Sequence, residues 1–151
     1  MFENLNKLVE LKKQYREAVR KDAQPFIEEA VKQFFDKHGD VVKAVRLRGY
    51  TPGFNDGDPC VFSLRELELK LKKEALEAYG DDTYEDDSYW EDRYTNAWKA
   101  QSKETRDDFE AMSRAFNAID DALELIYNSE GFELVMTAKG IEVDLDYDCG
   151  H

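Results

Sequence analysis

Residues 41–71, VVKAVRLRGYTPGFNDGDPCVFSLRELELKL, decide the fold that this sequence predicts. The first run, residues 41–50, alternates apolar and basic side chains, with Arg46 and Arg48 on one face, as in a strand. Residues 61–71 alternate again after a long loop. We therefore expect a long antiparallel hairpin, although residues 67–76 could instead be helical.

Amphipathic helices are predicted on both sides of this hairpin. Residues 5–19 and residues 26–35 repeat apolar side chains every three or four positions, and Pro25 suits the first turn of a second helix. The two segments could instead form one helix kinked at the proline. A third helix is predicted from the most regular spacing in the chain, a seam of Phe109, Met112, Phe116, Ile119, Leu123 and Ile126.

The C-terminal part predicts a second hairpin. Residues 132–136 lead to a Lys139-Gly140 turn, and residues 141–148 then alternate apolar and acidic side chains, which predicts one buried and one acidic face. The expected fold class is α+β, an antiparallel sheet of two hairpins with amphipathic helices packed on one face. A chain of 151 residues is the usual size of a single domain, here residues 1–151.

The charge is distributed unevenly along the chain. The formal net charge is -13. Residues 1–50 carry 11 Lys or Arg against 8 Asp or Glu, whereas residues 51–151 carry 10 against 26. Direct binding to a nucleic-acid backbone is disfavoured, because it depends on cations that displace counterions from phosphates. A protein partner with a basic surface is expected instead.

Composition also bears on the compartment. No apolar run reaches the roughly 18 residues of a membrane helix, and the first residues lack the basic and apolar regions of a signal peptide. The cysteines, Cys60 and Cys149, are too few for a disulfide framework, although a single bridge stays open. We expect reduced thiols, a cytoplasmic protein and no membrane association.

An acidic and aromatic connector is predicted at about residues 80–94. Residues 81–92 contain seven carboxylates and three aromatic side chains, and we expect them to be exposed. Carboxylates can occupy an Arg- and Lys-lined groove built for phosphates while aromatic side chains act as anchors, but a solvated linker is the simpler interpretation. The predicted partner-binding residues are Glu85, Asp86, Asp87, Tyr89, Trp90, Glu91 and Asp92.

The long loop of the first hairpin, YTPGFNDGDPC from Tyr50 to Cys60, is rich in turn-forming residues. Its prolines, glycines and Asx side chains are explained by a structural loop. The alternative is a site for a small phosphorylated ligand such as a nucleotide signal, built from Arg46, Arg48, Tyr50, Phe54, Asn55, Asp56 and Asp58. Cross-strand pairing of the arginines with Glu66 and Glu68 is the simpler interpretation of the basic face.

This eleven-residue segment resembles the Tyr-Thr-Pro-x-Phe-Asn-Asp-Gly-Asp/Glu-Pro-Cys motif of uncharacterised small proteins in bacteriophage and prophage genomes. The match covers only Tyr50 to Cys60 of the 151 residues. The resemblance implies a viral accessory protein in a host cytosol, a setting in which small acidic proteins often inhibit host enzymes or defence systems. It implies no catalytic residue.

A divalent-metal site near the C-terminus is a further hypothesis. Carboxylates on one strand face suit magnesium, manganese or calcium, whereas a thiol and an imidazole suit zinc. The candidate ligands are Asp144, Asp146, Asp148, Cys149 and His151, with Cys60 as a further zinc ligand. A solvated acidic strand face is the simpler interpretation. A metal-dependent enzyme would combine this cluster with Asp56 and Asp58.

The sequence favours binding over catalysis. It contains no recognisable Ser-His-Asp, Cys-His or HExxH arrangement, and we expect neither enzymatic activity nor a cofactor. The leading hypothesis is an acidic inhibitor that docks on a host nucleic-acid-handling or defence protein, with nucleic-acid mimicry as its candidate mode of binding. The alternatives are the ligand-binding protein and the metal-dependent enzyme described above. The apolar seam is interpreted as core, and the oligomeric state stays open.

Overall fold

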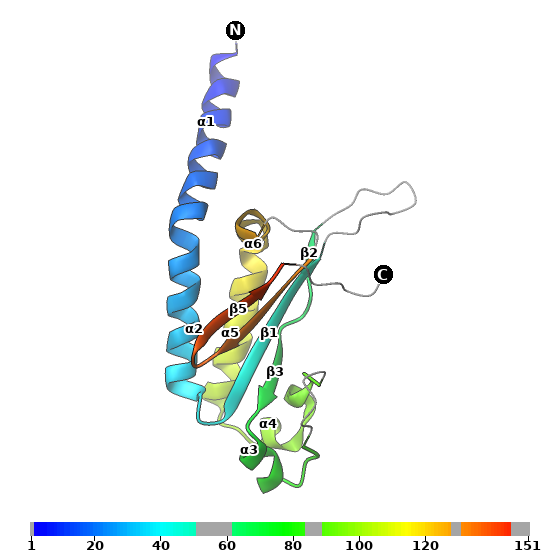
Figure 1. The fold of residues 1–151 in the computed structure, drawn as a ribbon. Coiled ribbons are helices and arrows are strands. Elements are labelled where there is room, and N and C mark those ends of the chain that lie inside the picture. Colours follow the sequence, from blue (N-terminus) through cyan, green and yellow to red (C-terminus); the bar gives the residue numbers. More distant parts are fainter. Residues whose placement is uncertain (1, 51–61, 84–88, 128–130, 146–151) are drawn as a thin grey trace, which may run out of the picture.

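The computed structural model describes residues 2–50, 62–83, 89–127 and 131–145, and its helices lie mainly against one face of an antiparallel sheet (Figure 1). This confirms the predicted α+β class. In chain order the elements are α1 (Glu3–Ala18), η1 (Val19–Ala23), α2 (Gln24–His38), β1 (Val42–Tyr50), β2 (Ser63–Leu64), β3 (Glu68–Leu71), α3 (Lys73–Ala78), η2 (Asp92–Tyr94), α4 (Asn96–Lys99), α5 (Lys103–Ala118), α6 (Asp120–Tyr127), β4 (Gly131–Thr137) and β5 (Gly140–Asp144).

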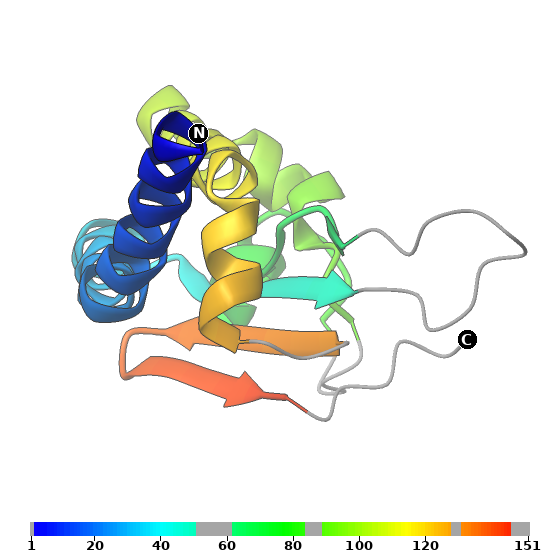
Figure 2. The same ribbon diagram turned by 90° about the horizontal axis from the view of Figure 1, so that it is seen from above.

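Strand β1 is the centre of the sheet. It pairs with β2 and β3 on one side and with β4 on the other, and β4 pairs with β5, all antiparallel. Both predicted hairpins are therefore present, and the pairing of Leu47 with Leu134 and of Arg48 with Glu133 joins them into one sheet. Seen from above, α2, α5 and α6 lie on the same side of this sheet (Figure 2).

The second strand of the first hairpin is interrupted, so the prediction of one continuous strand over residues 61–71 was wrong. Only β2 and β3 are strands, and Leu67 lies between them with 2% of its surface exposed. The connection keeps one link to β1, because the Arg65 amide donates a hydrogen bond of 2.8 Å to the Arg48 carbonyl oxygen. The helix that follows, α3, begins only at Lys73.

The first two helices follow one another without a break, as the single-helix alternative predicted. A π-helical turn, η1, joins α1 to α2, and Pro25 lies in the first turn of α2. Proline has no amide hydrogen and its ring clashes with the carbonyl four residues earlier, which lies in η1. A π turn is a common way for a helix to absorb such a disturbance.

The predicted seam helix is present, but it divides at Ile119 into α5 and α6. Ile119 has φ -113° and ψ 27°, outside helical geometry. Two aspartates after it stabilise the break, because Asp120 accepts a hydrogen bond from the Asp121 amide at 2.8 Å and Asp121 accepts one from the Ala122 amide at 2.9 Å. The seam still faces the core on both sides of the break, where Phe116 is buried before it and Leu123 after it.

The core lies between the helices and the sheet. Phe132 of β4 is fully buried and packs against Tyr127, with ring centroids 5.0 Å apart, and against Phe62 at 5.8 Å. Gly49 of β1 lies under these rings. A Cβ atom there would stand 2.4 Å from the Phe132 ring and 2.8 Å from the Phe62 ring, so this close approach requires glycine.

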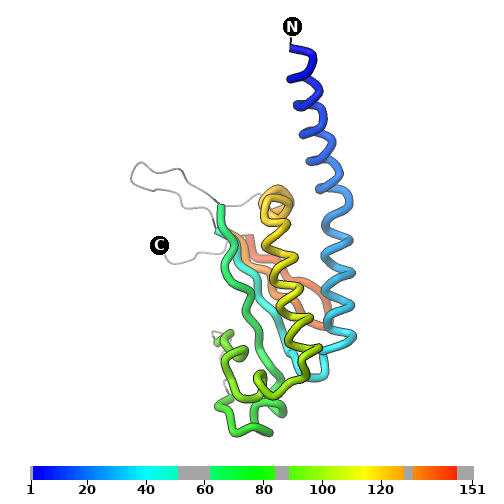
Figure 3. Tube along the Cα trace, turned by 180° about the vertical axis from the view of Figure 1, so that it is seen from behind, coloured from blue at the N-terminus to red at the C-terminus, as the bar shows by residue number. Residues whose placement is uncertain are grey.

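Two expected buried faces are exposed instead. Helix α1 has no buried residue and projects beyond the sheet, as the tube in Figure 3 shows, so only the later helices pack on it. At the end of the second hairpin, Val143 and Leu145 are 42% and 47% exposed, so the apolar face predicted for residues 141–148 is not buried there.

Candidate partner-binding surface

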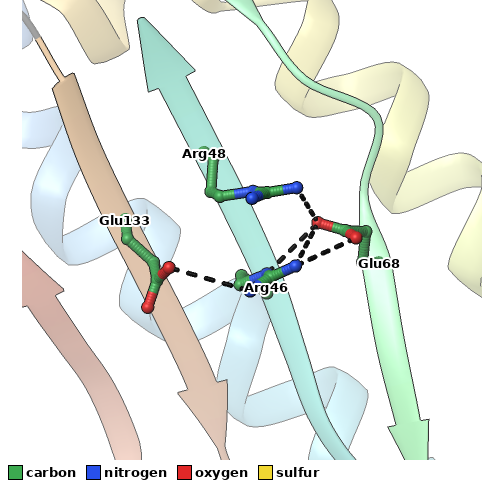
Figure 4. Close-up of polar contacts among 4 residues, drawn as sticks. All are labelled: Arg46, Arg48, Glu68 and Glu133. Carbon is green, nitrogen blue, oxygen red and sulfur yellow. Dashed lines mark hydrogen bonds and ion pairs between the residues drawn. The ribbon is translucent and has the colours of Figure 1, made fainter. Parts of the chain in front are cut away.

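The sheet face opposite the helices carries a charged network built on the first hairpin (Figure 4). Side chains alternate along β1, so Arg46 and Arg48 lie on this face, whereas Val45 and Leu47 lie on the other face and pack in the core. Glu68 of β3 lies directly opposite Arg46 in the register. Its carboxylate accepts hydrogen bonds of 3.0–3.1 Å from Arg46 and one of 2.9 Å from Arg48.

A second carboxylate completes the network from the other side of β1. The Glu133 carboxylate of β4 lies 3.8 Å from the Arg46 guanidinium, and both arginine side chains are largely buried, 12% and 21% exposed. The pairing with Glu68 that the sequence suggested is therefore confirmed, whereas Glu66 pairs with Arg93 instead. The charge of the arginines is compensated within the protein.

The Trp90 ring packs over the cations of this network. Its ring lies 4.9 Å from the Arg46 guanidinium carbon and 4.5 Å from the Lys70 ammonium nitrogen, measured to the ring centroid, which is cation–π geometry. Trp90 is only 6% exposed, and Lys70 is 9% exposed. Trp90, in the C-terminal part of the connector, thus packs on the sheet face opposite the helices instead of pointing into solvent.

Asp92 fixes the same segment to the edge of β3. Its Oδ2 accepts a hydrogen bond of 2.8 Å from the Leu71 amide, and Glu91 forms a parallel bridge with Leu69. Asp92 is 3% exposed, and its Oδ1 accepts no hydrogen bond from the described residues. Burial raises the pKa of Asp92, and the Leu71 amide and the Lys70 charge partly oppose this rise.

The acidic segment therefore has fixed attachment points on both sides. Before it, the Asp81 carboxylate accepts hydrogen bonds from the amides of Asn96 at 3.2 Å and Ala97 at 2.7 Å, at the start of α4. After it, Trp90 and Asp92 are buried as described above. The connector is tied to the body of the protein at each end.

These contacts correct part of the predicted partner-binding set. Trp90 and Asp92, expected to be exposed, are buried and support the fold, because the Trp90 ring covers Arg46 and Lys70 and the Asp92 carboxylate accepts a hydrogen bond at the β3 edge. Tyr89 is half-buried and Glu91 is exposed. Glu85, Asp86 and Asp87 lie outside the described residues.

A polar cavity of about 420 Å³ lies beside the network. Of the predicted ligand-binding residues, Arg48 and Tyr50 line it, whereas Arg46 is covered by Trp90; Phe54, Asn55, Asp56 and Asp58 lie outside the described residues. Three arginines and three glutamates line the cavity: Arg48, Arg65, Arg93, Glu66, Glu68 and Glu91. This balance gives little net positive potential for a phosphate group.

The metal hypothesis concerns the end of β5. Asp144 is exposed there, and the other candidate ligands, Asp146, Asp148, Cys149, His151 and Cys60, lie outside the described residues. Within residues 2–50, 62–83, 89–127 and 131–145 no group of three or more His, Cys, Asp or Glu side chains is placed to hold a metal ion.

Sequence reasoning missed a second charged cluster, between α2 and α5. The buried His38 ring nitrogen Nε2 lies 2.7 Å from an Asp108 carboxylate oxygen, and Lys37 lies 3.1 Å from the same oxygen. These partners, His38 first, lower the pKa of Asp108. The two helices are 70 residues apart at this contact, so no local pattern could have indicated it.

Among the described residues, no helix combines the length and apolarity needed to cross a bilayer. Comparison with protein-family models, with curated proteins and with solved structures found no match to this chain.

Proposed function

We propose that this protein works by binding another protein, as an acidic inhibitor that docks on the basic surface of a host nucleic-acid-handling or defence protein. The setting is that of a phage-encoded accessory protein in a host cytosol. Carboxylates of the connector would occupy a groove built for phosphates, and steering between opposite charges would speed the encounter.

The observation that carries this proposal is the anchoring of the acidic connector. A solvated linker would need neither a buried tryptophan nor a buried carboxylate, yet Trp90 and Asp92 hold one end of the connector and Asp81 holds the other. A segment fixed at both ends loses less conformational entropy when it binds a partner than a free linker does. The anchored ends of the connector therefore suit a docking surface better than a free linker.

The charge distribution supports the same proposal. The arginines at the centre of the sheet face opposite the helices are neutralised by Glu68 and Glu133, and the formal net charge of the whole chain is -13. On the same face, β5 adds the exposed Glu142 and Asp144. The field of this face is acidic, which suits a basic partner.

Charge-neutralising variants test the proposal. The connector variant carries Glu85→Gln, Asp86→Asn, Asp87→Asn and Glu91→Gln, and it leaves Asp92 intact because that residue is buried. A matched control removes the same charge from exposed positions on the long helix, through Glu3→Gln, Glu10→Gln, Glu17→Gln and Glu28→Gln. Both variants keep an acceptor oxygen at each site.

The readout is an affinity pull-down from a bacterial host lysate at low and high salt, followed by association kinetics with the captured partner. We expect a basic partner that wild type and control capture alike and that duplex DNA displaces. The connector variant should associate about tenfold more slowly, with a weaker salt dependence. Equal rates for the two variants, or no enriched basic partner, would contradict the proposal.

A second candidate function, binding of a small phosphorylated ligand, is favoured by one observation, the polar cavity beside Arg48 and Tyr50. Its balanced charge makes this the weaker proposal. A thermal-shift screen against linear and cyclic nucleotides checks it, with Arg48→Gln as the variant that should abolish any shift. If no nucleotide changes the melting temperature, this second candidate is wrong.

A further inference from the structure

Helix α1 presents an apolar surface that the described part of its own chain leaves largely uncovered; the Tyr15 hydroxyl, near the end of the helix, donates a hydrogen bond of 2.9 Å to the Asp121 carboxylate. It has no buried residue. Its large apolar and aromatic side chains are about half exposed or more: Leu5 at 57%, Leu8 at 61%, Val9 at 67%, Leu11 at 59% and Tyr15 at 47%. The helix projects away from the sheet in both side views (Figures 1 and 3). An exposed apolar face of this extent is typical of an interaction site.

The second feature is an apolar groove of about 700 Å³ between the long helix and α5. Small side chains of both helices form its walls, among them Ala23, Ala30, Ala111 and Ala115, and Phe26 at its edge is 72% exposed. Small residues let a further helix approach closely, so the shape of this groove suits a helix with large apolar side chains.

The apolar surface of α1 and the groove wall lie on one face of the long helix formed by α1, η1 and α2. Residues Tyr15, Val19, Phe26 and Ala30 of the groove wall follow one another at helical spacing, and Leu8 continues the same line toward the N-terminus. The α1 half of this face is convex and apolar, and the α2 half forms the groove. Such a face is complementary to a second copy of itself. Self-complementary faces pair about a two-fold axis.

We propose that a second copy of this chain fills the groove, with α1 of each protomer lying in the α2–α5 groove of its partner. The long helices run antiparallel, and the two-fold axis passes near Val19. Leu8 of one protomer then faces Ala30 of the other, and Arg16 faces Asp22.

The buried area fits a stable dimer. The 16 residues of α1 make a cylinder about 24 Å long and about 10 Å across. If each groove covers a little under half of that cylinder, the two symmetric contacts bury about 1,400 Å² in total, within the range of roughly 1,200–2,000 Å² for specific interfaces.

Charge favours the same occupant. Lys12 and Arg16 lie on the groove-facing side of α1, whereas Glu10 lies about 200° around the helix from Lys12. The helices that line the groove, α2, α5 and α6, carry ten carboxylates against five basic residues. The basic side of α1 therefore meets the acidic border of the groove, which favours a second copy over an acidic or neutral peptide.

Sedimentation equilibrium tests the proposal with single substitutions at exposed positions, Leu8→Glu on α1 and Ala111→Glu in the groove. We expect wild type to sediment at twice 17.6 kDa and each variant to dimerise at least about 100-fold more weakly. The matched control Val143→Glu, on the exposed part of β5, should remain a dimer. Circular dichroism checks that each variant keeps the wild-type fold.

Mixing the two variants provides the decisive measurement. In the proposed dimer, the intact α1 of the Ala111→Glu protein fits the intact groove of the Leu8→Glu protein, so the mixture should form heterodimers with one good contact. A monomeric wild type, with or without an apolar molecule in the groove, would overturn the proposal. So would a dimer that survives both substitutions or is lost only in Val143→Glu.

Discussion

The two faces of the sheet are stabilised in different ways. On the helix-covered face, Phe132 and Leu134 are fully buried among other apolar side chains. On the open face, Arg46, Arg48 and Glu68 are largely buried too, but within a network of ion pairs under Trp90. The comparison shows that burial on this sheet comes from packing on one side and from charge pairing on the other. Substitutions on the two faces should therefore have different costs and different pH and salt dependence.

The largest effect is expected on the packed face. Phe132→Ala removes the ring that contacts Tyr127 and Phe62, and we expect it to lower the free energy of unfolding by about 3–5 kcal/mol. Val135→Ala, on the open face of the same strand, is the control and should cost less than about 1.5 kcal/mol. Urea denaturation measures both. Similar losses for the two variants would remove the distinction between the faces.

A smaller effect is expected where the packed face is tightest. Gly49→Ala places a Cβ against the Phe132 and Phe62 rings, and overpacking of this kind should cost about 1–3 kcal/mol. Adding Phe62→Leu to this variant makes room, so the double variant should be less destabilised than the two single changes predict. Strictly additive costs would show that the rings do not restrict this position.

The open face should lose less from a single change. Glu68→Gln weakens the hydrogen bonds to both arginines, and we expect a loss of about 1–2 kcal/mol that shrinks at high salt. Glu133→Gln is the matched control. The Glu133 carboxylate lies 3.8 Å from Arg46, so its loss should lower the free energy of unfolding less than the loss of Glu68. A larger loss for Glu133→Gln would mean that the β4 side holds the network together.

The smallest effect, and one of opposite sign, is expected at Asp92. Burial raises the pKa of this carboxyl above its unfolded value, so the ionised group destabilises the fold at neutral pH, and stability is gained as the pH falls through the folded-state pKa. Asp92→Asn keeps an acceptor for the Leu71 amide without the charge. We expect this variant to unfold at a higher urea concentration than wild type at pH 7, with the difference vanishing at acidic pH.

The control for Asp92 is Asp82→Asn, which removes an exposed carboxylate from the same connector. It should leave stability unchanged at both pH values. A destabilised Asp92→Asn protein at pH 7 would show that the ionised carboxylate is required at the β3 edge.

Local patterns predicted the elements better than their partners. The period-two alternation of β1 and the three- and four-residue spacing of the seam are local properties, and both elements are present. The apolar spacing could not predict the break at Ile119, because this spacing continues across the break while the backbone hydrogen bonds change there. Likewise, the amphipathic pattern of α1 could not reveal that the described body of the protein leaves this helix uncovered.

The candidate site was predictable only in part. The register of a hairpin brings Arg46 and Glu68 together, so their pairing follows from alternation. The burial of Trp90 and Asp92 could not be predicted in this way, because the acidic composition of the connector is that of a solvated linker. Their contacts to Lys70 and Leu71 bridge about 20 residues and depend on how the chain returns to the sheet.

The π turn at Val19–Ala23 has a mechanical consequence. Helix α1 forms an arm about 24 Å long that this turn joins to α2. A bend of about 10° at the turn moves the tip of the arm by about 4 Å, which is close to the width of one side chain. Any small change of backbone angle around Pro25 would therefore produce a larger displacement at the N-terminal end of α1.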